Sequence, residues 1–220
     1  MAGSVSIADS GEVCAELAIA PPVRTMQALA PAIQSILETA GWQFHDIGLV
    51  AVAHGPGSFT GLRIGVTTAK LLAYANSCRL VAVDTLAVIA HQVNPHRRQV
   101  WALIDALRDQ LFVARFCRGE GDADAALRQL AATSLVDVGS WIAGLADECL
   151  TGPGIERIQS RLPSGVDVAD RDQWSPRAAT VARLAWLAHL RGEHSDPWTL
   201  IPNYLRASYA DEPRPVTGSP

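Results

Sequence analysis

The residues best suited to chemistry gather between positions 54 and 70, which read HGPGSFTGLRIGVTTAK. An apolar run ends at Gly55-Pro56-Gly57 and a helical pattern follows at once, which is the arrangement of a phosphate-binding loop. A Walker A loop needs a lysine directly after its last glycine, whereas Leu62 follows Gly61 here. A dinucleotide fingerprint needs G-x-G-x-x-G, and Thr60 occupies the third glycine position. The sequence therefore lacks both standard nucleotide motifs.

What remains of the loop is a helix N-terminus with free backbone amides. Such an end attracts anions, and it is equally an ordinary strand-to-helix turn closed by a side-chain cap. Ser58 and Thr60 are the candidate caps. The possible anion-binding residues are Gly55, Pro56, Gly57, Ser58 and Thr60.

The helix after the loop carries small residues at every fourth position, namely Gly61, Gly65, Ala69 and Ala73. This spacing predicts one nearly bare ridge along the helix. A glycine inside a helix costs about 1 kcal/mol relative to alanine, so another backbone should approach this ridge closely. That backbone belongs either to the chain's own sheet or to a second subunit. Arg63, Thr67, Lys70 and Tyr74 fall on another, more polar face.

Other candidate catalytic groups are few. Asp84, Asp105 and Asp109 fall at or just after predicted strand ends, where α/β proteins often bind metals or phosphates, but isolated aspartates there are commonly turn residues. His54 precedes the loop, and His91 and His96 flank a linker. The chain has no G-x-S-x-G or H-E-x-x-H motif, and its four cysteines are far apart. These absences argue against an α/β-hydrolase nucleophile, a metallopeptidase site or a zinc site.

Composition indicates an ordinary globular protein rather than a disordered, nucleic-acid-coating or membrane protein. The 220 residues are 49% hydrophobic and 18% charged, and the net charge is −4. A negative net charge provides no broad basic surface for nucleic acid. We find neither a membrane span nor a secretory signal, and we expect a cytoplasmic protein with reduced thiols.

The sequence predicts two similar α/β halves. The first half predicts a hairpin over 4–19, helices over about 24–40 and 60–75, and buried strands between and after them. The second half repeats the strand followed by Gly-Pro-Gly at 152–154, and it ends in a helix that starts near Ser175, the expected cap, and stops at Gly192. We expect lobes at 1–96 and 97–202, with 203–212 packing back on the first lobe and 211–220 mobile.

The stretch GPGSFTGLRIGVTTAKLLAYA closely resembles the signature of the bacterial TsaB (YeaZ) family. Further along, LVAVDTLAVIA and PNYLR resemble other segments of that family. The family's Asp-Ala-Arg segment is matched by Asp105-Ala106-Leu107 followed by Arg108, so leucine stands where arginine is expected. The chain also begins just before the family's second strand, so its first strand is apparently missing.

The resemblance implies an actin-like, Hsp70-like ATPase (ASKHA) fold with two ribonuclease-H-like lobes. It implies a non-catalytic subunit for making threonylcarbamoyladenosine beside the tRNA anticodon. Implied partners are a TsaD-like catalytic subunit, a TsaE-like ATPase and a second copy when alone, with tRNA held mainly by the complex. We expect no cofactor or metal on this chain alone. ATP with Mg²⁺ is expected only at an interface of the complex.

We expect the partner interface on the helices at about 24–40 and 60–75. Its candidate residues are Met26, Leu29, Ile33, Gly61, Arg63, Gly65, Ala69, Lys70 and Ala73. The alternative is an autonomous ATP-dependent kinase or ATPase of the same fold, which stoichiometric ATP binding and turnover by this chain would reveal. A peptidase has no nucleophile or metal set to support it.

Overall fold

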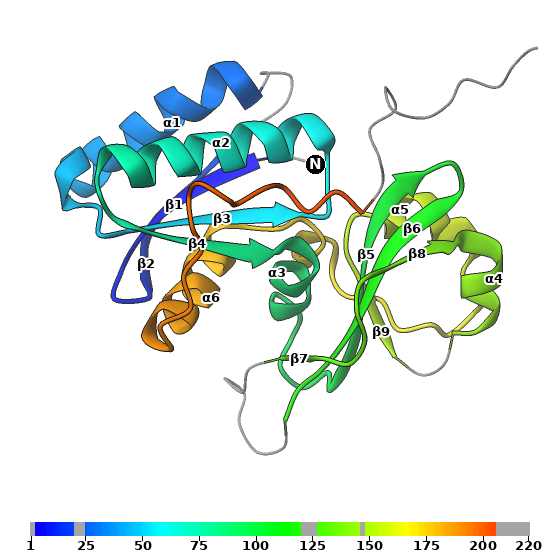
Figure 1. Ribbon diagram of the computed structural model, residues 1–220. Coiled ribbons are helices and arrows are strands. Elements are labelled where there is room, and N and C mark those ends of the chain that lie inside the picture. The colour runs from blue at the N-terminus through cyan, green and yellow to red at the C-terminus, as the bar shows by residue number, and fades with distance from the viewer. Residues whose placement is uncertain (1–2, 20–24, 120–126, 146–147, 206–220) are drawn as a thin grey trace, which may run out of the picture.

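The computed structural model describes residues 3–19, 25–119, 127–145 and 148–205. The chain forms a mixed α/β structure, as the sequence predicts, in which two small strand pairs and one larger sheet are covered by helices (Figure 1). The strands are β1 (Gly3–Asp9), β2 (Glu12–Ile19), β3 (Leu49–Gly55), β4 (Arg79–Asp84), β5 (Gln99–Leu107), β6 (Gln110–Cys117), β7 (Arg128–Gln129), β8 (Ser134–Asp137) and β9 (Cys149–Thr151). The helices are α1 (Thr25–Ala40), α2 (Phe59–Ala75), α3 (Thr85–His91), α4 (Val138–Ala143), α5 (Ile155–Ile158) and α6 (Ala178–Leu190), with short 3₁₀ turns at Phe44–Asp46, Gln159–Arg161 and Arg171–Gln173.

The first four strands form two separate pairs. Strands β1 and β2 make the predicted antiparallel hairpin, whose turn holds Ser10 and Gly11 at positive φ. Strands β3 and β4 pair in parallel. No ladder among the described strands joins β1 to β3. Helices α1 and α2 lie on one side of these pairs and α6 on the other, so the two pairs occupy one layer (Figure 1).

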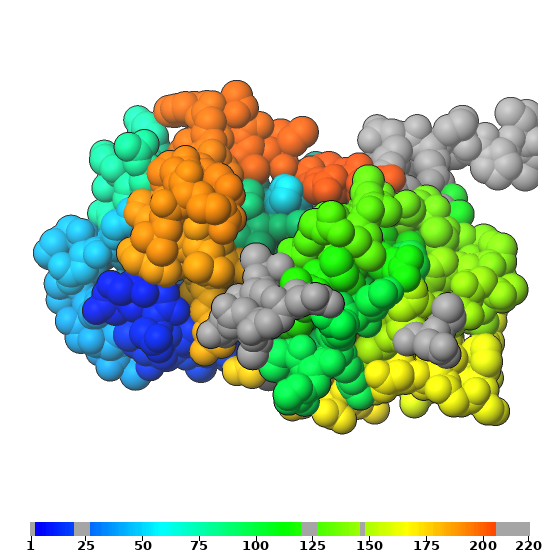
Figure 2. Space-filling model, turned by 90° about the horizontal axis from the view of Figure 1, so that it is seen from below, coloured from blue at the N-terminus to red at the C-terminus, as the bar shows by residue number. Residues whose placement is uncertain are grey.

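Helix α6 starts on the hairpin. The amide of Ala178 donates to Ser4 Oγ at 2.8 Å, and the amide of Ala179 donates to Glu16 Oε1 at 3.0 Å. Arg177 also pairs with Glu16 at 2.5 Å. Figure 2 shows the hairpin in blue beside α6 in orange. The hairpin therefore caps the helix, because its oxygen atoms accept from amides that have no partner within the helix.

This docking corrects two predictions. The predicted cap, Ser175, does not cap the helix; its carbonyl oxygen accepts from Gln92 Nε2 instead. The predicted second lobe, 97–202, includes residues that pack with the first four strands: Val181 and Ala185 share a core with β4, and the Ser195 amide donates to the Leu80 carbonyl at 2.7 Å. The predicted boundary between the lobes does not separate α6 from the first four strands. Contacts between segments that are distant in the sequence decide the position of this helix.

The second sheet has the strand order β7-β6-β5-β9, with β8 also paired to β6. Strand β5 is its buried centre, since Val100, Ala102 and Leu103 have no exposed surface. It runs antiparallel to β6 and parallel to β9. Helix α3 covers one face of this sheet, and α4 and α5 pack against the other. Burial on both faces explains the continuous apolar run of β5.

The two Gly-Pro-Gly triplets are alike in space as well as in sequence. Gly55 is the last residue of β3 and Gly152 directly follows β9, and both have positive φ, +130° and +111°. In each case a backbone carbonyl from another segment, that of Asn203 or Leu103, lies where a side chain would begin. Close approach of a second backbone is thus the shared reason for glycine in both turns.

Three further expectations concern the C-terminal segment and membrane spans. Of the segment 203–212, Asn203 contacts the first strands, since its amide donates to the His54 carbonyl at 2.7 Å, whereas Leu205 packs against the core of the second sheet. Residues 206–212 of the same prediction, and the tail 211–220, lie outside the described residues. Among the described helices, none combines the length and the apolar character needed to cross a bilayer.

We predict uneven protection against hydrogen exchange. Strand β5 is fully buried at its centre, whereas Val5 in β1 and Val52 in β3 are only half-buried although helices lie on both sides. Amides of β1 and β3 should therefore exchange through local opening, and those of β5 only through global unfolding. Mass-spectrometric exchange of the intact chain measures this difference. Equal protection in both regions would contradict it.

A second prediction concerns Gly152. Its replacement by alanine should destabilise the chain by about 2–3 kcal/mol, since the new methyl group would overlap the Leu103 carbonyl and the backbone is strained for alanine. Gly48→Ala is the control, because nothing lies within 4 Å of its added carbon and its φ is ordinary. Urea unfolding of both variants provides the comparison, and equal stabilities would refute the close-approach account.

Candidate functional site

The Gly-Pro-Gly loop is held by its own surroundings. The Gly55 amide donates to Thr85 Oγ1 at 3.2 Å, and His54 Nδ1 lies 3.0 Å from the Val83 carbonyl oxygen. Ser58 Oγ accepts from the Gly61 amide at 3.4 Å, so Ser58 is the cap of α2, as predicted. Thr60 is exposed in the first turn. The geometry favours a capped strand-to-helix turn, and anion binding by this loop stays a prediction.

The segment 196–205 passes over the loop. A carbon added to Gly55 would lie 2.6 Å from the Asn203 carbonyl oxygen. The Tyr204 ring stacks on Phe59 with centroids 4.6 Å apart, and the Arg63 guanidinium lies 4.7 Å from the Phe59 centroid. The first turn of α2 is thereby packed against residues that follow it by more than 130 positions. The loop's glycine thus allows the chain's own backbone to approach closely.

The small-residue ridge of α2 faces inward. Ala69 and Ala73 are buried with Val50 and Leu80. A carbon added to Gly65 would lie 3.8 Å from Val52 Cγ2, an ordinary contact with β3. Of the two packing partners that the sequence leaves open, the structure provides the chain's own sheet. A role of these residues in a subunit interface stays a prediction.

The outer face of α2 carries exposed apolar side chains. Leu71 is 62% exposed and Tyr74 is 64% exposed. Tyr74 meets Trp198 edge-to-face at 5.3 Å, and Trp198 and Ile201 are themselves 75% and 72% exposed. We call these four residues the apolar surface. Arg63 and Thr67 are exposed on the same helix, whereas Lys70 Nζ donates to the Leu200 carbonyl at 2.9 Å.

Sequence reasoning missed most of this surface. It noted Tyr74 as part of a polar face, but Leu71, Trp198 and Ile201 were not singled out. Trp198 and Ile201 lie outside any helix or strand, so no periodic pattern marks them. Helix α1 contributes the half-buried Leu29 and Ile33, and it packs on β1 and β2 beside α2. The side chain of Met26, another predicted interface residue, lies outside the described part.

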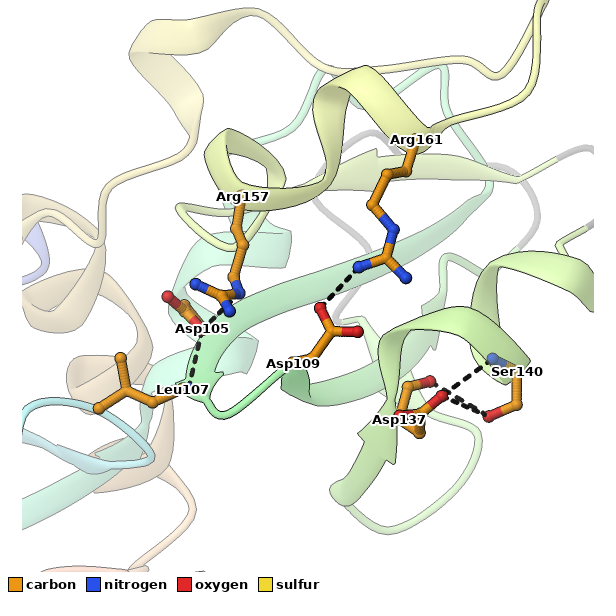
Figure 3. Close-up of polar contacts among 7 residues, drawn as sticks. All are labelled: Asp105, Leu107, Asp109, Asp137, Ser140, Arg157 and Arg161. Carbon is orange, nitrogen blue, oxygen red and sulfur yellow. Dashed lines mark hydrogen bonds and ion pairs between the residues drawn. The ribbon is translucent and has the colours of Figure 1, made fainter.

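The three candidate aspartates have structural contacts. Asp84 caps α3 by accepting from the Ala87 amide at 2.9 Å, and burial raises the pKa of its carboxyl. At the β5–β6 turn, Asp105 accepts from the Leu107 amide at 2.8 Å and faces Arg157, while Asp109 pairs with Arg161 at 2.6 Å (Figure 3). The alternative interpretation of these aspartates, as turn residues, fits the structure.

That turn has unusual backbone geometry. Leu107, Arg108 and Asp109 all have positive φ, at 64°, 52° and 57°. Three successive non-glycine residues in this region are uncommon. The aspartates at the two ends of the turn, Asp105 and Asp109, both pair with arginines of one segment, Arg157 and Arg161 (Figure 3). Neighbouring Asp137 caps α4, and its bond from the Ser140 amide lowers the pKa of its carboxyl.

The histidines offer little catalytic machinery. Burial, with a contribution from the charge of Arg118, lowers the pKa of His91 to about 4, so its ring is neutral at physiological pH. His96 is exposed in the linker, where its amide donates to Asn94 Oδ1. Within the described ranges, no three histidine, cysteine, aspartate or glutamate side chains gather as a metal site would require.

We predict that Gly55→Ala loosens the segment 196–205. The added methyl group would push Asn203 away from the loop and separate Tyr204 from Phe59. Chymotrypsin should then cleave after Tyr204 faster than in the unmodified chain, at a temperature where both are folded. Gly61→Ala is the control, because its added carbon lies 3.6 Å from Ser58. Equal cleavage of all three proteins would contradict the prediction.

Comparison with known proteins places this surface in context. A family model for TsaD, tRNA N6-adenosine threonylcarbamoyltransferase, matches residues 24–160. The tRNA threonylcarbamoyladenosine biosynthesis protein TsaB of Bacillus subtilis is 28% identical over 189 residues, which cover 82% of this chain and 79% of that protein. Its Escherichia coli namesake is 36% identical over 119 residues, 53% of this chain and 51% of that protein.

A solved structure agrees with these sequence matches. YeaZ from Pseudomonas aeruginosa superposes with a TM-score of 0.77 at 27% identity, over 93% of this chain and 94% of that one. The TsaD model covers more than half of the chain, and TsaB and YeaZ proteins match it in sequence and in fold. The chain therefore belongs to the TsaD family and, within it, to the TsaB (YeaZ) proteins.

Proposed function

We propose that this chain is a non-catalytic subunit in the biosynthesis of threonylcarbamoyladenosine in tRNA. It would act by binding a TsaD-like catalytic subunit, which transfers the threonylcarbamoyl group to adenosine beside the anticodon. A TsaE-like ATPase would join the pair, and any ATP with Mg²⁺ would bind at an interface of that complex. The names of the TsaB relatives support the pathway. Because tRNA is modified in the cytoplasm, we place the chain there.

The observation that carries the subunit role is the apolar surface. Its four side chains are between 62% and 75% exposed, and two of them are aromatic. Tyrosine and tryptophan at the centre of a protein interface supply much of its binding energy when a partner excludes water from them. The Tyr74–Trp198 contact and the Lys70–Leu200 hydrogen bond fix two segments in one surface. A rigid surface of this kind loses little conformational entropy on binding.

The inward-facing ridge supports the same role indirectly. Because Ala69 and Ala73 pack closely on β3 and β4, helix α2 lies firmly on its sheet and presents its other face outward. The larger side chain of a Gly65→Leu variant would overlap β3, so this variant would test folding as well as partner binding. Side chains on the outer face provide a cleaner test. The same surface would also serve self-association when the catalytic partner is absent.

We predict that Leu71→Asp weakens binding of a TsaD-like partner by about tenfold or more, since it places a charge in the core of the interface. Leu190→Asp is a matched control: Leu190 is 64% exposed against 62% for Leu71, and it lies on α6, across the strand layer. Calorimetric titration with the TsaD protein of the same genome measures both affinities.

Melting curves should show that both variants fold like the unmodified chain, because each side chain is exposed. If the two aspartate variants bind the partner equally well, α2 is not the interface. If the unmodified chain binds no TsaD-like protein at all, the subunit role itself fails.

A further inference from the structure

Two histidines meet at the C-terminal end of helix α6, away from the Gly-Pro-Gly loop. His189 lies in the last turn of the helix, and His194 follows it by five positions. The Nδ1 atom of His189 is 2.9 Å from the Nε2 atom of His194, and the ring centroids are 5.0 Å apart. His189 is half-buried and His194 is exposed, so an ion can reach this pair of nitrogens from solvent.

The backbone between the two histidines is fixed by the end of the helix. Gly192 has a φ of +76°, and its amide donates to the His189 carbonyl at 2.9 Å. The next amide, that of Glu193, donates to the Ala188 carbonyl at 3.0 Å. These bonds close the helix with a left-handed glycine, which is a common helix C-cap. The two imidazoles therefore start from a defined backbone.

Trp186 orients the ring of His189. The two rings stack with centroids 5.3 Å apart and planes inclined by 28°. Trp186 is itself held on the turn of the β1–β2 hairpin, since a carbon added to Gly11 would lie 2.5 Å from Trp186 Cδ1. Groups that pack behind a metal ligand set its orientation and so contribute to affinity. His189 has such support, whereas the exposed His194 can adjust to an ion.

The charges around the pair favour a cation. Arg191 and Glu193, which lie between the histidines in the sequence, form two hydrogen bonds with each other at 2.8 Å and 2.9 Å. Their opposite charges offset each other, and the Glu193 carboxylate is engaged by Arg191. The partial negative charge at the C-terminal end of α6 adds to this, because cations are stabilised beside the last turn of a helix.

The distance between the two nitrogens limits the kind of ion. Histidine nitrogens bind metals such as zinc at about 2.0–2.1 Å. Two nitrogens 2.9 Å apart then subtend an angle of about 90° at the ion, whereas a tetrahedral site would need them about 3.3 Å apart. The rings must turn so that their lone pairs converge on the ion, and χ2 of histidine is a broad torsion that allows this. A right angle suits neighbouring ligands of a square-planar or octahedral site.

We propose that His189 and His194 bind a divalent transition-metal ion of the nickel or copper type as two neighbouring ligands. Imidazole nitrogen suits these ions, and a square arrangement of nitrogen and oxygen ligands is typical of them. Among the described residues no third histidine, cysteine, aspartate or glutamate side chain joins the pair, so water fills the other positions. Mg²⁺ and Ca²⁺ prefer oxygen ligands and do not bind here. The inference does not rest on the proposed function.

The test is a calorimetric titration of the full chain, free of any added histidine tag, with NiCl₂ in a buffer that does not bind metals. The unmodified chain should bind Ni²⁺ saturably. His194→Gln should weaken binding by about tenfold or more, because one of two ligands is lost. His189→Phe should do the same, while its ring can still pack against Trp186.

His45→Gln is the matched control. His45 has a side chain that is 80% exposed, and it lies on the 3₁₀ turn Phe44–Asp46. Its replacement should leave the Ni²⁺ affinity unchanged, and metal-free melting curves should show that the variants fold like the unmodified chain. Absence of saturable Ni²⁺ binding, or equal affinities in all four proteins, would overturn the proposal.

Two further measurements test the ligands and the geometry. In NMR spectra, a small amount of Ni²⁺ should broaden the imidazole ring signals of His189 and His194 and leave those of His45 sharp. Zn²⁺, which prefers tetrahedral sites, should bind more weakly than Ni²⁺, and Mg²⁺ should produce no binding heat. Equal broadening of all three histidines would overturn the assignment of the ligands, and tighter binding of Zn²⁺ would overturn the right-angle geometry.

Discussion

The packing of helix α6 on the first four strands is the constraint on which the rest of the structure depends. No ladder among the described strands joins β1–β2 to β3–β4, so shared helices must hold the two pairs in one layer. Helix α6 does this at its start, through Ser4, Glu16 and Arg177, and along its length, through Val181 and Ala185. A single ion pair of this exposure contributes little. The apolar contacts and the capped amides supply most of the stabilisation.

The position of α6 also decides where the following segment runs. From the end of the helix the chain lies along β4 through Ser195, then runs alongside α2 past Tyr74 and Lys70 and reaches the loop at Asn203. Trp198 is thereby set beside Tyr74. The apolar surface that we propose as the docking site is thus a consequence of the same packing. Its two halves are far apart in the sequence and meet only in the folded chain.

The Gly-Pro-Gly turns show that one local motif permits more than one explanation. Free amides after a strand fit an anion site, and they fit an ordinary capped turn equally well. In the structure both first glycines admit a neighbouring carbonyl, from Asn203 or Leu103, where a side chain would not fit. A pocket lined by Arg97, Arg98 and Arg115 lies elsewhere, where β5, β6 and β9 bring separate stretches of the chain together.

The sequence by itself determined the features that depend on neighbouring residues. These are the hairpin, the helices α1 and α2, a side-chain cap at the start of α2, the absence of standard nucleotide motifs and the family signature. Only the tertiary structure decided the rest: that the ridge of α2 faces β3, that α6 joins the first strands, and that Trp198 meets Tyr74. Periodicity shows that a helix has distinct faces, but not which element covers each one. That choice is made by contacts between segments such as Lys70 and Leu200, separated by 130 positions, which no local pattern encodes.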